Sequence, residues 1–225
     1  LIKNNKKVVI IGGGTAGLTI ANSIQNHFKV SVVEKSKYKS YPFWFKVPLF
    51  IGILLRKKNS KYVSKRYFKL ANGRNVPFFE SNVLGGASVI NGCVHMLGNK
   101  AQWNSILHNF KFDYDDLIKS YNKIYSLKPK SKNQINLTYA YQNIIDNAFI
   151  KVLNKKKIPI GDMNYSDEEA CGSILNTSKF FFRTSVMSLF GKKNFDTYIG
   201  EDVKKILFDN HGKVTGVRTN LRVLS

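Results

Sequence analysis

The sequence predicts an α/β fold, in which helices flank a parallel sheet, on three observations. The run Val8–Ile11 is apolar and β-branched, as expected for a strand that is buried on both faces. A glycine-rich turn follows it, and apolar residues then recur at helical spacing at Leu18, Ala21 and Ile24. A second apolar strand, Lys29–Val33, comes next. Strand, helix and strand in this order are the repeating unit of a parallel sheet.

The glycine-rich turn predicts a dinucleotide site. Gly12, Gly14 and Gly17 fit the spacing G-x-G-x-x-G, which allows a tight turn, close approach of a pyrophosphate, and close helix–strand packing. The helix that follows offers N–H groups to the phosphates. Glu34 ends the second strand 20 residues after Gly14, where such folds hold the ribose hydroxyls. The alternative is a glycine-rich surface turn with an ordinary acid at a strand end. Since all these features occur together, a Rossmann-like dinucleotide-binding domain is favoured.

The composition excludes general disorder and limits the function classes. The 225 residues are 43% hydrophobic and 13% aromatic, which is enough for a sizeable core. The net charge of +22 would ordinarily suggest nucleic acid or an anionic membrane. Most of the basic residues are Lys, however, and they occur in short clusters such as Lys155–Lys157 without a single arm or a nucleic-acid motif. We therefore predict no specific nucleic-acid partner.

The two cysteines indicate a reducing compartment. Cys93 and Cys171 provide neither a disulfide framework nor the spacing of a metal site, so no metal is predicted. The expected location is the cytoplasm.

The most apolar stretch of the chain is "YPFWFKVPLFIGILL", residues 41–55. It contains Pro42, Lys46 and Pro48, and it falls short of the about 20 apolar residues that a transmembrane helix requires. A buried or lid-like segment is expected here. Peripheral contact with a membrane surface is the minor alternative.

A second small-residue stretch, "ESNVLGGASVINGCVHMLGN", covers Glu80–Asn99. Gly85, Gly86, Ala87 and Ser88 would let the backbone approach a bulky planar or phosphorylated ligand. A close contact between a helix and a sheet would need the same small residues, so the pattern alone leaves both interpretations open.

This stretch resembles the first signature of the glucose–methanol–choline (GMC) family of FAD-dependent oxidoreductases. The matching positions are Leu84, Gly85, Gly86, Ser88, Ile90, Asn91 and Gly98. The departures from the family pattern are Ser81, Ala87 and His95. Members that carry covalent flavin have a His at the position of Ile90, so the resemblance implies a non-covalent cofactor.

The resemblance continues over nearly the whole chain. The segment "NFKFDYDDLIKSYNKI" is similar to the family's helix that opens with an aromatic-Asp-Asp run. A turn at Asp162 and Asn164 and an Arg-x-Ser step at Arg183 and Ser185 follow in the family's order. The end of the chain resembles the strand and hairpin that return to the FAD domain, with a turn at "DNHGK".

The resemblance implies FAD as cofactor and oxidation of a CH–OH donor by hydride transfer to the flavin. The implied partners are a small alcohol-type substrate and an unidentified electron acceptor. Thr15, Ala16, Glu34 and Lys35 would hold the pyrophosphate and adenosine end. The flavin would be lined by Ala87, Asn91, Gly92, Cys93 and Val94, and Val203 would meet the adenine through its main chain.

The family's catalytic His lies near the C-terminus of a longer chain, so we expect this sequence to correspond to the N-terminal part. No catalytic residue is assigned. His27 and His211 are expected in solvated positions and His108 in a polar connector, while His95 is expected in the core or in a supporting position next to the cofactor site. Residues 1–36, 78–104 and 177–225 would form the FAD-binding domain, 37–77 a lid, and 105–176 part of an α+β substrate domain. The alternatives are a non-oxidative flavoenzyme of this fold, such as a hydroxynitrile lyase or a fatty-acid photodecarboxylase, and a non-catalytic FAD-binding remnant.

Overall fold

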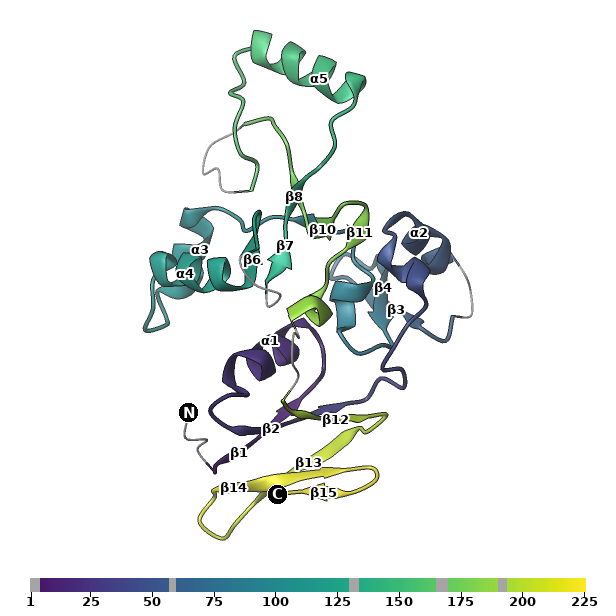
Figure 1. Cartoon of the computed structure of the whole chain (residues 1–225), viewed down its shortest axis with the longest axis vertical. Helices are drawn as coiled ribbons and strands as arrows, with labels where there is room; N and C mark the ends of the chain where they lie inside the picture. The colour runs from purple at the N-terminus through teal and green to yellow at the C-terminus, as the bar shows by residue number, and fades with distance from the viewer. Residues whose placement is uncertain (1–4, 57–59, 130–133, 165–169, 190–193) are drawn as a thin grey trace. The chain divides into compact units, whose positions relative to one another are not determined.

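The structure is a computed structural model that describes residues 5–56, 60–129, 134–164, 170–189 and 194–225 (Figure 1). The chain divides into two compact units: residues 1–92 with 185–225 form unit 1, and residues 93–184 form unit 2. Residues 57–59 of the predicted lid, and 130–133 and 165–169 of the predicted substrate segment, lie outside the described residues. The functions that the sequence predicts for each range remain predictions.

A parallel sheet with one crossover helix forms the centre of unit 1. Strand β1 (Lys7–Ile11), helix α1 (Thr15–Ile24) and strand β2 (Lys29–Glu34) follow one another, and β12 (Asp196–Ile199) joins much later in the chain. The strand order is β1-β2-β12, and both pairs are parallel (Figure 1). The predicted strand–helix–strand unit is therefore confirmed.

The sequence explains why this unit is stable. Val30, Val32 and Val33 of β2 are all buried, as a strand covered on both faces requires. Leu18 and Ala21 lie on one face of α1 and are fully buried. They cover the sheet because residues three or four apart share a helix face. The carboxyl ends of β1, β2 and β12 meet at one edge of this sheet, which is where ligands bind in open α/β sheets.

Two antiparallel groups of strands and several short helices complete unit 1. The strands β3 (Val63–Lys69) and β4 (Asn75–Ser81) form a hairpin. A second group has the order β13-β14-β15, with β13 (Val203–Phe208) and β14 (Val214–Thr219) joined at the predicted turn. The remaining elements are η1 (Phe43–Lys46), α2 (Leu49–Arg56), η2 (Gly86–Val89), η3 (Val186–Leu189) and β15 (Val223–Leu224).

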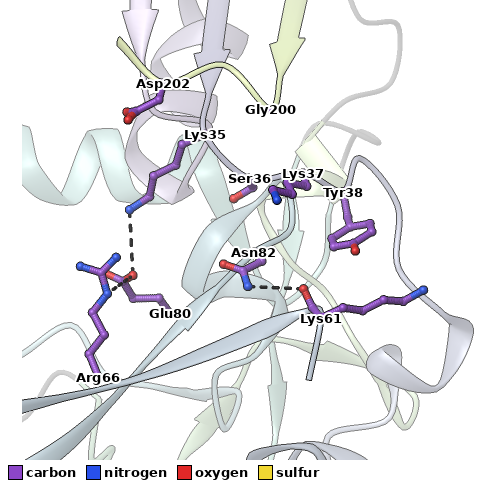
Figure 2. A pocket seen from close by; sticks show the side chains of 10 residues that line it. All are labelled: Lys35, Ser36, Lys37, Tyr38, Lys61, Arg66, Glu80, Asn82, Gly200 and Asp202. Carbon is purple, nitrogen blue, oxygen red and sulfur yellow. Dashed lines mark hydrogen bonds and ion pairs between the residues drawn. The ribbon is translucent and has the colours of Figure 1, made fainter. Parts of the chain in front are cut away.

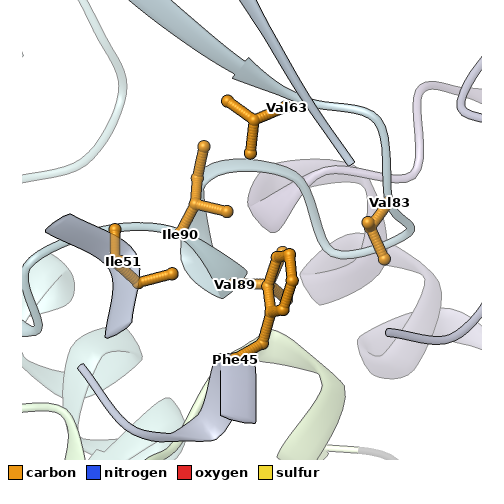
Figure 3. Close-up of a cluster of buried hydrophobic side chains, with 6 residues drawn as sticks. All are labelled: Phe45, Ile51, Val63, Val83, Val89 and Ile90. Atoms are coloured by element: carbon orange, nitrogen blue, oxygen red, sulfur yellow. The ribbon is translucent and has the colours of Figure 1, made fainter. Parts of the chain in front are cut away.

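A hydrophobic cluster ties the 41–55 stretch to the second glycine motif. Its buried members are Phe45, Ile51, Val63, Val83, Val89 and Ile90 (Figure 3). The stretch is buried only in part, because Leu49 and Phe43 remain 81% and 64% exposed. The expectation of a buried segment is thus correct for its inner face alone.

The described residues of unit 2 form short strands and three helices. Asp113 accepts from the Asp116 N–H at the start of α4 (Tyr114–Ile124), and Asn143 with Asp146 forms a capping box at the start of α5 (Ile144–Lys155). The other helix is α3 (Lys100–Leu107). The strands are β5 (Val94–His95), β6 (Tyr125–Ser126), β7 (Ile135–Asn136), β8 (Thr138–Tyr139), β9 (Leu175–Asn176), β10 (Ser178–Lys179) and β11 (Phe182–Arg183).

Candidate functional site

The glycine turn joins β1 to α1 in unit 1. Gly12 has a φ of +101°, a conformation that favours glycine, and its N–H donates to the Val33 carbonyl at 2.8 Å. Gly14 is the N-cap of α1, and glycine has no side chain to occupy the first N–H groups of the helix. The N–H groups of Thr15, Ala16 and Gly17 therefore begin a helix whose positive dipole end faces the turn.

The glycines of the turn have different surroundings. A Cβ at Gly17 would overlap the carbonyl oxygen of Gly12, so this position is restricted by helix–strand packing. A Cβ at Gly14 would meet nothing within 4 Å. The open space at Gly14 is the cradle that a phosphate group would fill and that a larger side chain would block.

Glu34 lies directly beside this turn. Its side chain is buried, and its carboxylate accepts from the N–H of Gly13 and from the N–H of Ser36, the latter at 2.7 Å. An ionised carboxylate has about four acceptor positions. It can therefore accept further hydrogen bonds from hydroxyl groups while these two backbone contacts hold it in place.

The second glycine motif packs against the first. The Gly85 N–H donates to the Gly13 carbonyl at 2.8 Å, and Gly86, at φ +58°, is so close to Gly14 that a Cβ on it would lie 2.9 Å from the Gly14 Cα. A larger residue at Gly86 would therefore collide with the backbone of Gly14. The structure thus brings together two motifs that lie about 70 residues apart in the sequence.

The residues around η2 divide into buried and accessible ones. The Ser88 hydroxyl is buried and donates to the Gly85 carbonyl at 2.7 Å, so it is engaged within the protein. Ala87, Asn91 and Gly92 are exposed in unit 1. Ala16 is also exposed, at the start of α1.

Cys93 and Val94 belong to unit 2. Cys93 is buried at a φ of +66°, and burial raises the pKa of its thiol, an effect that the charge of Arg183 and a hydrogen bond with Thr177 partly offset. Val94 is 54% exposed. Their predicted contact with a flavin stays a prediction.

A cavity of about 520 Å³ opens in unit 1 beside Lys35, the residue that follows Glu34 in the sequence (Figure 2). Lys35 and Arg66 both point to the Glu80 carboxylate, at 3.9 Å and 3.0 Å. The lining comes from four separate stretches of the chain: Lys35, Ser36, Lys37, Tyr38, Lys61, Arg66, Glu80, Asn82, Gly200 and Asp202. Of these, the sequence predicted only Lys35, because the others carry no motif and meet only through the fold.

The loop before β13 supplies the far wall of this cavity. Asp202 lines it, and a hydrogen bond from Lys204 lowers the pKa of its carboxyl. Glu201 is buried, where it pairs with Arg222 at 2.9 Å and accepts from the Thr219 hydroxyl. Val203, the predicted adenine contact, begins β13 directly after this loop.

The histidines lie largely where the sequence predicted them. His27 follows α1, and His211 lies exposed in the β13–β14 turn. His108 is the C-cap of α3 rather than part of a connector. His95 contacts the Tyr121 hydroxyl through Nε2 at 2.5 Å, and burial lowers the pKa of its imidazole.

The described part of the chain contains neither a metal-binding cluster nor a membrane-spanning helix. No group of three or more His, Cys, Asp or Glu residues there could hold a metal ion. No helix among the same residues is long and apolar enough to cross a bilayer.

Sequence comparison finds distant relatives. No family model matches the chain. The (R)-mandelonitrile lyase 4 of Prunus serotina is 26% identical over 145 residues, which are 64% of this chain and 24% of the relative. The pyranose dehydrogenase of Agaricus campestris is 26% identical over 125 residues, or 52% of this chain and 20% of the relative. The chain thus matches about a quarter or less of each curated relative's length.

Solved structures share the fold over nearly the whole chain. A pyridoxine 4-oxidase from "Mesorbium loti" superposes with a TM-score of 0.77 at 16% identity, covering 96% of this chain and 46% of that one. A formate oxidase gives a TM-score of 0.73 at 18% identity, covering 97% and 43%. These structures are GMC flavoenzymes, as are the two curated relatives. The chain is thus similar in sequence and in fold to flavoenzymes of the glucose–methanol–choline family, and it spans less than half of the length of the solved structures.

Proposed function

We propose that the chain is the FAD-binding part of an oxidoreductase that acts on a CH–OH donor. The observation that carries this proposal is a juxtaposition in unit 1: the open position at Gly14, the buried Glu34 carboxylate and the Gly85–Gly86 turn lie together at the carboxyl edge of a parallel sheet. This combination suits a dinucleotide in a Rossmann-like arrangement. The two solved structures that share the fold are oxidases, and one of the two sequence relatives is a dehydrogenase, which supports FAD as the dinucleotide.

The residues of the turn fit the phosphate and ribose groups of FAD. The N–H groups of Thr15 and Ala16 would donate to the pyrophosphate at the positive end of α1. The free acceptor positions of Glu34 would receive the ribose hydroxyls, since Gly13 and Ser36 already hold the carboxylate in a fixed orientation. When bound, FAD supplies the hydride acceptor.

The cavity beside Lys35 would take the adenosine end. Lys35 directly follows Glu34 in the sequence, and the cavity volume of about 520 Å³ suits a group of this size. Val203 would contribute a main-chain contact to the adenine. Ala87, Asn91 and Gly92 are the accessible residues of the second motif and would contact the flavin, with Cys93 and Val94 following them in the chain.

The flavin would be held without a covalent bond. Ile90 stands where family members with covalent flavin have a His, and it is buried in the hydrophobic cluster (Figure 3). An aliphatic side chain offers no nucleophile. We therefore expect that denaturation releases the cofactor.

The same proposal assigns the domain ranges, the substrate class and the cellular compartment. Residues 1–36, 78–104 and 177–225 are assigned to FAD binding, 37–77 to a lid, and 105–176 to part of a substrate domain. The substrate would be a small alcohol, and the electron acceptor is unassigned. The burial of the Cys93 and Cys171 side chains supports a reducing compartment such as the cytoplasm.

A non-oxidative flavoenzyme is not favoured. One curated relative is a mandelonitrile lyase, but the other is a dehydrogenase and the two solved structures described above are oxidases.

The cofactor proposal is tested on the purified chain after incubation with FAD and removal of the excess. We expect a yellow protein, and acid precipitation should leave the flavin in the supernatant. Colour retained in the pellet would contradict the non-covalent assignment. A chain that binds NADP⁺ but not FAD would contradict the cofactor itself, because Glu34 should repel a 2′-phosphate.

A further inference from the structure

The segment from Lys35 to Phe79 has an unusual charge. It contains 12 Lys or Arg residues and no Asp or Glu, so a third of the chain's 36 basic residues lie in this part of unit 1. A segment of this kind is attracted to any surface of negative charge.

Helix α2 lies within this segment and is apolar almost all round, with the sequence "LFIGILLR". A soluble surface helix normally has one polar face. The inner face of α2 is accounted for, because Ile51 is buried in the hydrophobic cluster with Phe45 of η1 (Figure 3). The outer face is also apolar, and it meets solvent.

This outer face, made by η1 and α2 together, consists of Phe43, Leu49, Phe50 and Ile53. Their exposed fractions are 64%, 81%, 41% and 54%. The exposed cations Lys46 and Arg56 lie within the same two elements, and Lys57 and Lys58 follow Arg56 in the sequence. Apolar side chains bordered by cations are the pattern of a helix that lies in a membrane interface.

The adjoining β3–β4 hairpin has a similar surface. Tyr67, Phe68 and Phe78 are 62%, 52% and 53% exposed, and the exposed cations Lys65 and Lys69 lie on the same hairpin. Aromatic rings of this kind favour the headgroup region of a bilayer.

We propose that the outer face of η1 and α2 docks onto the surface of a bilayer that contains anionic lipids. Leu49, Phe50 and Ile53 would enter the boundary between headgroups and acyl chains, while Lys46 and Arg56 contact the lipid phosphates. Helix α2 has 8 residues, so it lies on the bilayer and does not cross it. A nucleic acid is the less suitable partner for this face: the rings of Phe43 and Phe50 could stack on bases, but Leu49, its most exposed side chain, is aliphatic and could not.

The test is co-sedimentation of the 225-residue chain with vesicles of phosphatidylcholine, with or without phosphatidylserine. We expect binding to the anionic vesicles that weakens as the salt concentration rises. The double variant Leu49→Gln, Ile53→Gln should bind at least about tenfold more weakly, since two exposed aliphatic side chains are lost from the contact. Circular dichroism should be unchanged, because both side chains are exposed and Gln is a good helix former.

The matched control is Phe181→Gln, which removes a ring that is 85% exposed at the β10–β11 turn of unit 2. It should leave vesicle binding unchanged. The proposal is wrong if the chain does not bind anionic vesicles, or if the control weakens binding as much as the double variant. It is also wrong if a single-stranded oligonucleotide binds equally well to the wild type and the double variant and displaces the vesicles. Because no arm uses FAD, failure here is separate from failure of the proposed function.

Discussion

At the scale of single residues, Gly14 and Gly17 have different roles although both belong to one motif. A Cβ at Gly17 would overlap the Gly12 carbonyl, so Gly17→Ala must shift the helix or the strand. We expect the free energy of unfolding to fall by about 1–3 kcal/mol, as for other overpacked sites. Urea unfolding followed by circular dichroism measures this change. Gly14→Ala, whose Cβ enters open space, is the control and should unfold like the wild type. An equal fall in the free energy of unfolding of both variants would contradict this difference between Gly14 and Gly17.

His95 predicts a pH dependence of stability. Its imidazole is partly buried against Tyr121 and Tyr125, and burial lowers its pKa below the ordinary value of 6.5. As the pH falls below about 6.5, the unfolded chain binds this proton first, so folding loses stability until the pH passes the lower pKa of the folded state. His95→Phe should remove this part of the loss between neutral and mildly acidic pH. If the free energy of unfolding changes with pH by the same amount in both proteins, His95 does not contribute.

At the scale of elements, a turn in unit 2 depends on one buried amide. The Asn164 Nδ2 donates to Asp162 at 2.7 Å, and the Asn164 Oδ1 accepts from the Leu175 N–H at the start of β9. Asn164→Ala leaves that buried N–H without its acceptor, which should destabilise the fold by about 1–3 kcal/mol. A lower midpoint temperature of thermal unfolding in Asn164→Ala should show this loss of stability. The exposed Asn147, on α5, provides the matched control Asn147→Ala, and an equal effect of both substitutions would argue against the role of Asn164.

Elements defined by local pattern could be predicted from the sequence, and contacts between distant segments could not. The β1-α1-β2 unit was predictable because the apolar runs, the glycine spacing and the helical spacing of Leu18, Ala21 and Ile24 are all local features of the sequence. The cavity beyond Lys35 was not, since its lining joins four stretches that have no common spacing. Ser88 shows a further limit: the motif does not predict that its hydroxyl donates to the Gly85 carbonyl, and its contact with the cofactor stays a prediction.

At the scale of the whole molecule, the placement of the histidines bears on activity. His27, His108 and His211 lie at element ends or in a turn, and the His95 Nε2 is occupied by the Tyr121 hydroxyl. A general base must come within about 3 Å of the proton that it removes. We therefore expect the FAD-loaded 225-residue chain to show no bleaching of its flavin band when mixed anaerobically with primary alcohols, choline or sugars. Bleaching that disappears in His95→Ala would make His95 the working base and overturn this expectation.

The central claim is that the turn between β1 and α1 holds the pyrophosphate of FAD, and calorimetric titration with FAD tests it most directly. The titration compares the wild type with Gly14→Val, with Gly52→Val as a control whose Cβ also enters open space. The Val side chain should prevent two charge-assisted hydrogen bonds between the turn and the pyrophosphate. The Gly14→Val variant should therefore bind FAD at least about 100-fold more weakly than the wild type, with an unchanged circular dichroism spectrum. The control should bind FAD normally. Wild-type affinity in Gly14→Val would contradict the account.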